Sequence, residues 1–179
     1  MARNFKSLRD VLAVLPPDGR PRNLIRKFNQ APIVDGKARS VKKLAIALGF
    51  DVVERDDLGR MSGQLVQDAF AKNGYRIEVN SRHSVQVKRW AVLHEIAHYY
   101  QHVDHNDFFA EPVAFDASGE TFYLDPSEER EANSFAEAVL FGDGALKAAL
   151  TLHGRNIERV ARQFGVSVRV VQIAMRRFG

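Results

Sequence analysis

Hydrophobic and polar positions along the chain predict helices at both ends and a short run of strands between them. Apolar residues at the amino terminus follow helical spacing and stop at Pro16-Pro17, so a helix should open the chain. A second helix should run from Ser40, as its N-cap, to Leu48, with Gly49 as its terminator. The apolar positions of the first helix are Phe5, Leu8, Val11, Leu12 and Leu15.

Strand-like runs follow the second helix. Asn73-Gly74 directly precedes the third of them and is a strong short-range signal for a hairpin. Before these elements, residues 16–32 are rich in Pro, Arg and Asn, and we expect a linker there with one short helix near Leu24 to Phe28. The three predicted strands are Asp51 to Glu54, Gly63 to Val66 and Tyr75 to Val79.

Two longer helices are predicted in the middle of the chain. The first should begin after Ser84 and end near His102, before a long loop over residues 103–124. The second should begin at Asp125 and run to about Phe141. Its start combines Asp125 as cap, Pro126 at the first helical position and Glu128 closing a capping box. The apolar stripe of the first should consist of Trp90, Leu93, Ala97 and Tyr100.

Residues 157–178 have the outline of a helix-turn-helix. Gly165 should lie in the turn, and Ser167 should cap the second helix. The tail carries Arg169, Arg176 and Arg177, which could contact phosphates, but we favour docking to a protein partner or simple packing over direct DNA binding. The residues expected to face inward are Ala161, Val171 and Met175.

Composition narrows the class of protein. A chain of 179 residues, 45% of them hydrophobic, can bury a core without covalent staples. It contains no cysteine, so disulfides and thiolate metal sites are excluded, and His and carboxylate must hold any metal. The apolar run Val11 to Leu15 is too short for a signal-peptide core, and nothing approaches a membrane span. We therefore expect a soluble cytoplasmic protein with no membrane partner.

The net charge of +4 conceals a segregation along the chain. Residues 1–43 carry 11 Lys and Arg against 3 Asp and Glu, a net +8. Residues 44–152 carry 9 against 18, a net −9, and residues 153–179 carry 6 against 1, a net +5. The basic ends should therefore meet an anionic partner or fold back onto the acidic middle.

His94-Glu95-Ile96-Ala97-His98 is the most informative stretch for chemistry. Histidines four residues apart lie one above the other on a helix, so His94 and His98 can reach one metal ion. Glu95 is placed to act as the general base that takes a proton from a water activated by that metal. The spacing predicts a catalytic zinc site for peptide hydrolysis.

A catalytic zinc normally takes three protein ligands, so one more His, Asp or Glu is required. On the helix after Asp125, Glu129 shares a face with apolar residues, within about 80° at 100° per residue. Glu131 falls about 200° away and should point to solvent, while Glu128 should serve the cap. We therefore predict Glu129 as the third ligand. Asn133, one turn further, either holds a ligand imidazole or is a surface amide.

The remaining histidines and several tyrosines lack the spacing of a site. For the histidines we expect solvated or structural roles. The tyrosines could donate to an oxyanion, but core or rim packing is the better interpretation. These residues are His83, His102, His105, His153, Tyr99, Tyr100 and Tyr123.

The segments around the motif resemble the ImmA/IrrE family of bacterial metallopeptidases over roughly residues 40–179. The resemblance implies an α+β fold, namely a small zincin-like, gluzincin-like metallopeptidase domain with a three-stranded sheet and helices, followed by the helix-turn-helix-like segment. The expected division is 1–39 for the amino-terminal helix and linker, 40–152 for the zinc metallopeptidase domain and 153–179 for the tail. The matching segments are Val41 to Val53, Met61 to Leu65, Tyr75 to Ser84, His94 to His98 and Glu129 to Ala136.

The resemblance also implies a role. Members often act on a partner transcriptional repressor with a helix-turn-helix domain, in the control of mobile elements or stress responses. Cleavage of such a repressor by a zinc endopeptidase is therefore the expected function. The alternatives are a DNA-binding or adaptor regulator that keeps the zincin fold as a scaffold, and a toxin-like component of a two-gene module.

Overall fold

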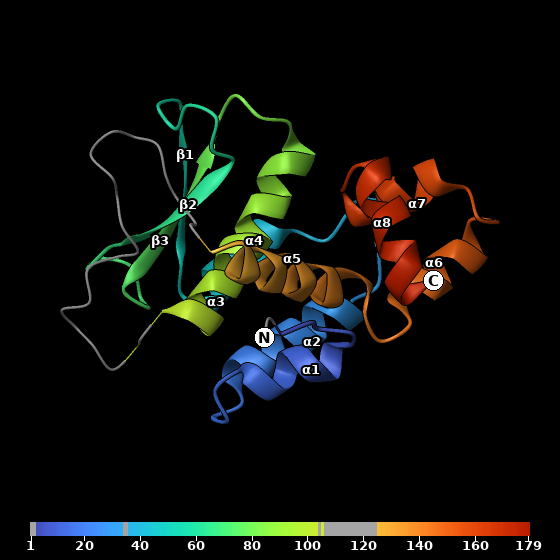
Figure 1. Ribbon diagram of the computed structural model, residues 1–179, viewed down its shortest axis with the longest axis horizontal. Helices are drawn as coiled ribbons and strands as arrows, with labels where there is room; N and C mark the ends of the chain where they lie inside the picture. Colours follow the sequence, from blue (N-terminus) through green and yellow to red (C-terminus); the bar gives the residue numbers. More distant parts are fainter. Residues whose placement is uncertain (1–2, 34–35, 104, 106–124) are drawn as a thin grey trace.

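Helices and a three-stranded sheet make up the described part of the protein, which confirms the expected α+β class. The computed structural model describes residues 3–33, 36–103, 105 and 125–179. Figure 1 shows the sheet at one end and α6–α8 at the other, with α4 and α5 between them. In chain order the elements are α1 (Leu8–Val14), α2 (Arg20–Gln30), α3 (Val41–Leu48), β1 (Asp51–Arg55), β2 (Gly63–Gln67), β3 (Tyr75–Asn80), α4 (Val85–His102), α5 (Pro126–Phe141), α6 (Ala145–Leu152), α7 (Ile157–Phe164) and α8 (Val168–Phe178).

The sheet has the order β1-β3-β2. β2 and β3 are antiparallel, with Gln67 opposite Tyr75, so the predicted hairpin is present, with residues 68–74 as its connection and Asn73-Gly74 at the end of that connection. β1 pairs with β3 in parallel, an arrangement that strand propensity alone does not specify. β2 is therefore an edge strand of the described sheet, and α4 packs against it and against β3.

The central helix α4 is buried over more of its circumference than a single stripe. Ser84 caps it as predicted, since its side chain accepts from the backbone N–H of Val87. The sheet, α3 and α5 all contact it, so the helix needs apolar side chains on several sides. Beyond the predicted stripe, Ala91, Val92 and Ile96 are also buried. The helix that carries the motif is thus held rigidly in the core.

The segment expected to be a linker contains a longer helix than predicted. α2 spans 11 residues, begins with proline in its first turn, and buries Ile25 and Phe28 in the core. The side-chain amide of Asn29 donates to the backbone carbonyls of Val139 and Gly142 at the end of α5. The helix predicted from the sequence was too short, because tertiary packing stabilises the rest of α2.

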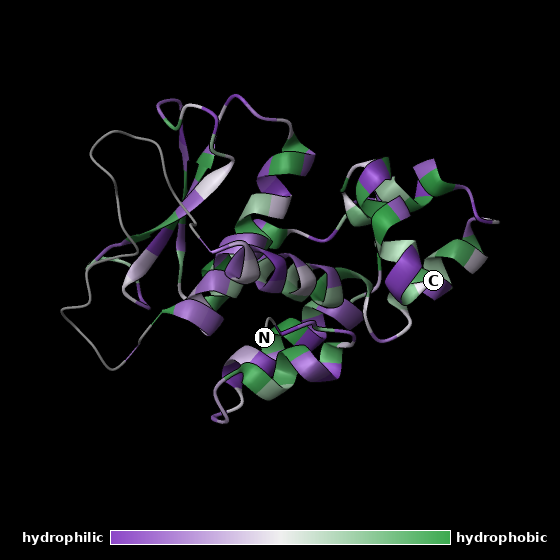
Figure 2. Ribbon diagram, viewed as in Figure 1, coloured by the Kyte–Doolittle hydropathy of each residue, from purple (hydrophilic) through white to green (hydrophobic). Residues whose placement is uncertain are grey.

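The helix α6 was not foreseen, whereas the helix-turn-helix outline is present. A three-residue turn that includes Gly165 joins α7 to α8. Ser167 caps the start of α8, and Val171 is buried. Figure 2 shows hydrophobic and hydrophilic residues interspersed along these helices, as amphipathic packing requires. The predicted loop over 103–124 lies almost wholly outside the described residues. Among the described residues, no helix has both the length and the hydropathy to cross a bilayer.

Gly165 lies where the helix-turn-helix contacts Arg89 of α4. Its φ of 66° lies in the left-handed region, and a Cβ there would meet Arg89 Nε at 2.5 Å and Ala38 Cβ at 2.8 Å. Arg89 is fixed, since it donates to the carbonyls of Phe164 and Gly165, both at 3.0 Å. A side chain at this position therefore meets both a backbone penalty and a steric one.

We expect Gly165→Ala to lower the free energy of unfolding by about 2–4 kcal/mol. Gly154→Ala is the matched control, because Gly154 has φ of 58° but no atom within 4 Å of a Cβ, and should cost only about 1–2 kcal/mol. Urea denaturation of both variants measures the difference. Equal losses would show that the contact with Arg89 is unimportant.

Both basic ends of the chain fold back onto α5. The backbone N–H of Arg3 donates to Glu131 Oε1 at 2.6 Å, and Arg177 Nη1 lies 2.5 Å from Glu137 Oε2. Burial raises the pKa of Glu137, and Arg177 partly opposes that rise. The acidic middle therefore receives the charge of Arg177 from the carboxyl end, whereas the amino end contributes a neutral backbone N–H.

Arg177→Met should leave the buried Glu137 carboxylate without its ion pair. We expect a loss of about 1–2 kcal/mol in unfolding free energy, less than the about 3–5 kcal/mol of a fully buried pair, because the Arg177 side chain is 33% exposed and screened by solvent. Adding Glu137→Gln should recover most of the loss in thermal or urea unfolding. A single variant as stable as the parent would contradict this account.

Candidate metal centre

The first two residues of the candidate site come from one stripe of α4. His94 and His98 are four residues apart, and their ring centroids are 4.7 Å apart. Trp90 precedes His94 by one turn and His102 follows His98 by one turn, so the stripe continues in both directions. The helix is continuous across all of them, and this continuity fixes the relative position of the imidazoles.

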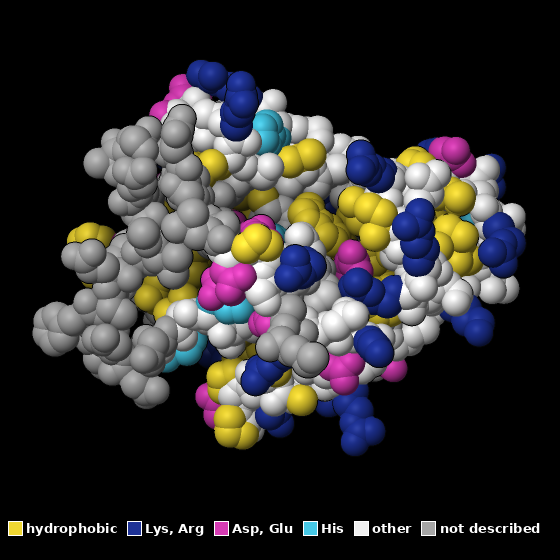
Figure 3. Space-filling model, viewed as in Figure 1, with side chains coloured by type: hydrophobic (Ala, Val, Ile, Leu, Met, Phe, Trp, Pro, Cys, Tyr) yellow, Lys and Arg dark blue, Asp and Glu magenta, His cyan; other side chains and the backbone are white. Residues whose placement is uncertain are grey.

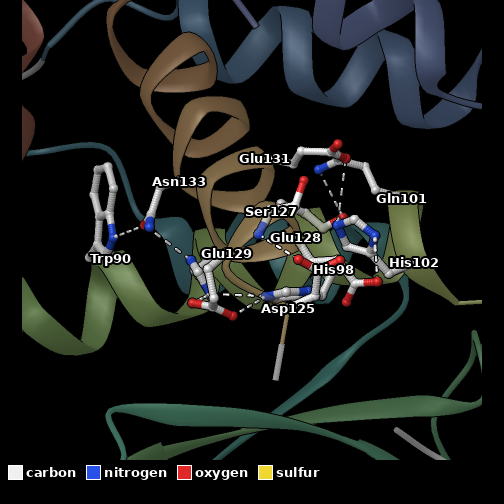
Figure 4. Close-up of polar contacts among 12 residues, drawn as sticks. Trp90, His98, Gln101, His102, Asp125, Ser127, Glu128, Glu129, Glu131 and Asn133 are labelled. Carbon is white, nitrogen blue, oxygen red and sulfur yellow. Dashed lines mark hydrogen bonds and ion pairs between the residues drawn. The ribbon is translucent and has the colours of Figure 1, made fainter. Parts of the chain in front are cut away.

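Glu129 on α5 faces the same point. His98 Nε2 lies 3.0 Å from His94 Nε2 and 3.1 Å from Glu129 Oε1, while His94 Nε2 lies 3.2 Å from Glu129 Oε2. Together the three residues offer ligand atoms that all lie within 4.8 Å of one another. Figure 4 shows Glu129 and His98 turned toward each other between α4 and α5. The structure thus brings together the three residues that the sequence singled out.

His94, His98 and Glu129 shift one another's pKa values. Burial by itself would raise the pKa of Glu129, but hydrogen bonds with His94 and His98 outweigh it and lower that pKa to about 2. Burial lowers the pKa of His98. Burial also acts to lower the pKa of His94, but Glu129 and Glu95 together raise it above its ordinary value. The cluster therefore combines an ionised carboxylate with two imidazoles, a donor set typical of catalytic zinc.

Glu95 lies beside the cluster of His94, His98 and Glu129. Its side chain is buried, and it borders a cavity of about 280 Å³ beside the cluster. The cavity lies between the start of β2, α4 and α5, so a substrate in it would meet the cluster and Glu95 together. It is lined by Met61, Ser62, Gly63, Trp90, Ala91, His94, Glu95, Glu129 and Asn133.

Asn133 contacts the cluster directly. Its Oδ1 lies 3.2 Å from His94 Nδ1, the nitrogen turned away from the other two candidate ligands. The interpretation of Asn133 as a support for a ligand imidazole is therefore favoured over a surface amide.

Two other carboxylates on α5 differ from expectation. Glu131 was predicted to point to solvent, but its side chain is only 15% exposed, because the amino-terminal segment runs along α5 and covers it. Glu128 was assigned to the helix cap, but its Oε1 lies 3.9 Å from His102 Nδ1. The cap hydrogen bond runs from the N–H of Ser127 to Asp125 Oδ1. Neither glutamate belongs to the three-residue cluster.

Of the other described histidines and tyrosines, His102 adjoins the cluster, since its ring centroid lies 5.1 Å from that of His98. Tyr99 packs edge-on against Phe50 and Tyr75, and burial raises the pKa of Tyr100, so both suit the packing interpretation. Tyr123 lies outside the described residues. His102 also lies near Glu128, His105 contacts the carbonyl of Tyr99, and His153 contacts Gln163.

Two features near the cavity were missed from the sequence. Trp90 was assigned only to an apolar stripe, but its indole N–H donates to Asn133 Oδ1 at 3.2 Å. The signal was its spacing of four residues from His94. Gly63 allows β2 to approach α4, since a Cβ there would meet Glu78 O at 3.0 Å and Ala91 Cβ at 3.1 Å. This close approach forms one wall of the cavity.

Comparison with known proteins agrees with this geometry. The family model of the IrrE N-terminal-like domain, which describes a family of metallopeptidases, matches residues 47–176. The matched range contains the whole sheet, α4 with its two histidines, and α5 with Glu129. No curated protein matches the sequence significantly. Since the family model covers well over half of the chain, the protein belongs to the IrrE N-terminal-like family of metallopeptidases.

Proposed function

We propose that this protein is a zinc-dependent endopeptidase that cleaves a partner helix-turn-helix transcriptional repressor. The observation that carries the proposal is the convergence of His94, His98 and Glu129 beside a cavity that Glu95 also borders. Two imidazoles and one carboxylate form a typical ligand set for catalytic zinc, and with no cysteine in the chain the thiolate sets are excluded. We accordingly assign His94, His98 and Glu129 as the zinc ligands and Glu95 as the catalytic residue.

The chemistry divides between the ion and the chain. Zinc, when bound, lowers the pKa of water and polarises a carbonyl. The Glu95 carboxylate accepts a proton from the attacking water, whose oxygen bonds to the peptide carbonyl carbon. Glu95 then gives the proton to the amine that leaves as the C–N bond breaks. Burial of Glu95 keeps bulk water from competing for this proton.

The cavity beside the cluster supports a peptide as the substrate. Gly63 at the start of β2, Glu95 and Glu129 all border it, so a peptide carbonyl held in the cavity would lie beside both the cluster and Glu95.

The choice of a repressor as substrate rests on the resemblance to ImmA/IrrE proteins, and with it we propose a cytoplasmic regulator of a mobile element or stress response. The test is incubation with the product of the neighbouring gene as the candidate repressor, with and without a chelator. Mass spectrometry should find one or a few cleaved bonds that chelation abolishes and added zinc restores. An intact repressor in all samples would refute this substrate, whereas cleavage that persists in the chelator would refute the zinc mechanism.

The tail supports a second candidate function, the binding of DNA. Exposed Arg169 and Arg176 lie on α8, and Figure 3 shows Lys and Arg side chains over the side of the molecule formed by α6–α8. If this surface binds duplex DNA, affinity should fall steeply as salt rises. Fluorescence anisotropy with duplex DNA compares the parent protein with the Arg169→Gln, Arg176→Gln double variant. Equally weak binding by the two proteins would exclude DNA binding by this surface.

A further inference from the structure

The indole of Trp90 and the imidazole of His94 share one acceptor. Asn133 Oδ1 lies 3.2 Å from Trp90 Nε1 and 3.2 Å from His94 Nδ1. Trp90 and His94 lie one turn apart on α4, while Asn133 reaches them from α5. Figure 4 shows the amide of Asn133 held between the indole on one side and the cluster on the other.

The donors and acceptors of this triad determine where the proton on His94 sits. An indole nitrogen can only donate, so the atom that Trp90 faces must be the amide oxygen and not the amide nitrogen. An amide oxygen can only accept, so His94 Nδ1 must carry a proton to bond to it. In the neutral ring the lone pair then lies on Nε2, the atom that faces His98 and Glu129.

Asn133 alone would not secure this arrangement. The terminal torsion of an asparagine is roughly two-fold, so its amide can turn by about 180° and present N–H groups to His94 instead. His94 would then need its lone pair on Nδ1 and its proton on Nε2, where a metal would have to bind. With Trp90 in place, the turned amide would point its N–H group at the indole N–H of Trp90, two donors with no acceptor between them. The free energy lost in this way disfavours the turned amide.

We propose that Trp90 is a positioning residue that locks the amide of Asn133, and through it holds His94 in the tautomer that can bind a metal. The inference rests on the proposed role of His94 as a zinc ligand. It gives a specific task to a side chain that otherwise lines the cavity and packs against the core.

Zinc affinity, measured by competition with a chelator of known strength, tests the lock. Trp90→Phe keeps the ring but removes the N–H, and it should weaken zinc binding about five-fold, the factor for one hydrogen bond of about 1 kcal/mol. The matched background is Asn133→Asp, whose carboxylate has no N–H to present whichever way it turns. In that background Trp90→Phe should change the affinity less than two-fold, about the scatter expected of such comparisons.

Two results would overturn the lock. One is an unchanged zinc affinity when Trp90→Phe is made in the parent protein. The other is an equal loss of zinc affinity in the parent and in the Asn133→Asp background, which would indicate packing alone. An NMR measurement on zinc-loaded protein does not depend on the Asp variant. The Nδ1–H of His94 should exchange slowly with solvent in the parent and several-fold faster after Trp90→Phe, and unchanged exchange would also overturn it.

These measurements separate the lock from the proposed function because none of them requires hydrolysis. A protein that binds zinc and shows the expected pattern but cleaves no peptide would refute the endopeptidase and leave the lock standing. A parent protein with no zinc affinity would refute both.

Discussion

Glu95→Gln is expected to abolish most peptide hydrolysis while leaving bound zinc in place. The neutral amide cannot accept a proton from the attacking water, and loss of a general base typically slows such a step by about 10²–10⁴-fold. Gln has nearly the same size, so the buried position beside the cavity should remain filled. The measurement is the rate of repressor cleavage by mass spectrometry, with zinc content determined on the same samples.

The control for Glu95→Gln is its metal content. Because Glu95 is assigned to proton transfer and not to metal binding, zinc should stay at the level of the parent protein. Cleavage at the parent rate would show that another group takes the proton. A loss of zinc in step with activity would instead show that Glu95 belongs to the metal-binding set.

Glu129→Gln is expected to weaken zinc binding by about 100-fold or more, since the about 10–16 kcal/mol of a zinc site is shared among only a few ligands. The pKa of Glu129 is lowered to about 2, so the carboxylate is ionised at neutral pH and its charge is available to a cation. Substitution by Gln removes that charge but keeps the length of the side chain. Chelator competition measures the change.

Glu131→Gln is the matched control, on the same helix and two residues away. Its carboxylate accepts from the N–H of Arg3, a bond that an amide oxygen can also make, and it lies outside the three-residue cluster. Zinc affinity should therefore change less than two-fold, within ordinary experimental scatter. If Glu131→Gln weakened zinc as much as Glu129→Gln, a general effect of negative charge would replace the assignment of a specific ligand.

Local sequence signals predicted the elements that carry the site. Ser84 and Asp125 mark the starts of α4 and α5, and the spacing of four between His94 and His98 already places them on one face. The choice of Glu129 over its neighbours followed from helical periodicity, because the side that buries Ala132 and Ala136 is also the side that faces α4. These inferences needed only the geometry of a single helix.

Features that depend on tertiary contacts could not be predicted in this way. Glu131 is covered by the amino-terminal segment, which lies 128 residues away in sequence. The full length of α2 depends on packing of Ile25 and Phe28 in the shared core, and the parallel pairing of β1 with β3 depends on the path of the intervening chain. The spacing of four residues from His94 places Trp90 next to the site, but its bond to Asn133 crosses between helices, so the periodicity of α4 does not predict that partner.

A crystal structure of the zinc-loaded protein, with anomalous diffraction recorded on both sides of the zinc absorption edge, tests the central assignment most directly. We predict a single strong anomalous peak about 2.0–2.2 Å from Nε2 of His94, Nε2 of His98 and a carboxylate oxygen of Glu129. A peak held by other side chains, or crystals with stoichiometric zinc elsewhere and none at this point, would contradict it.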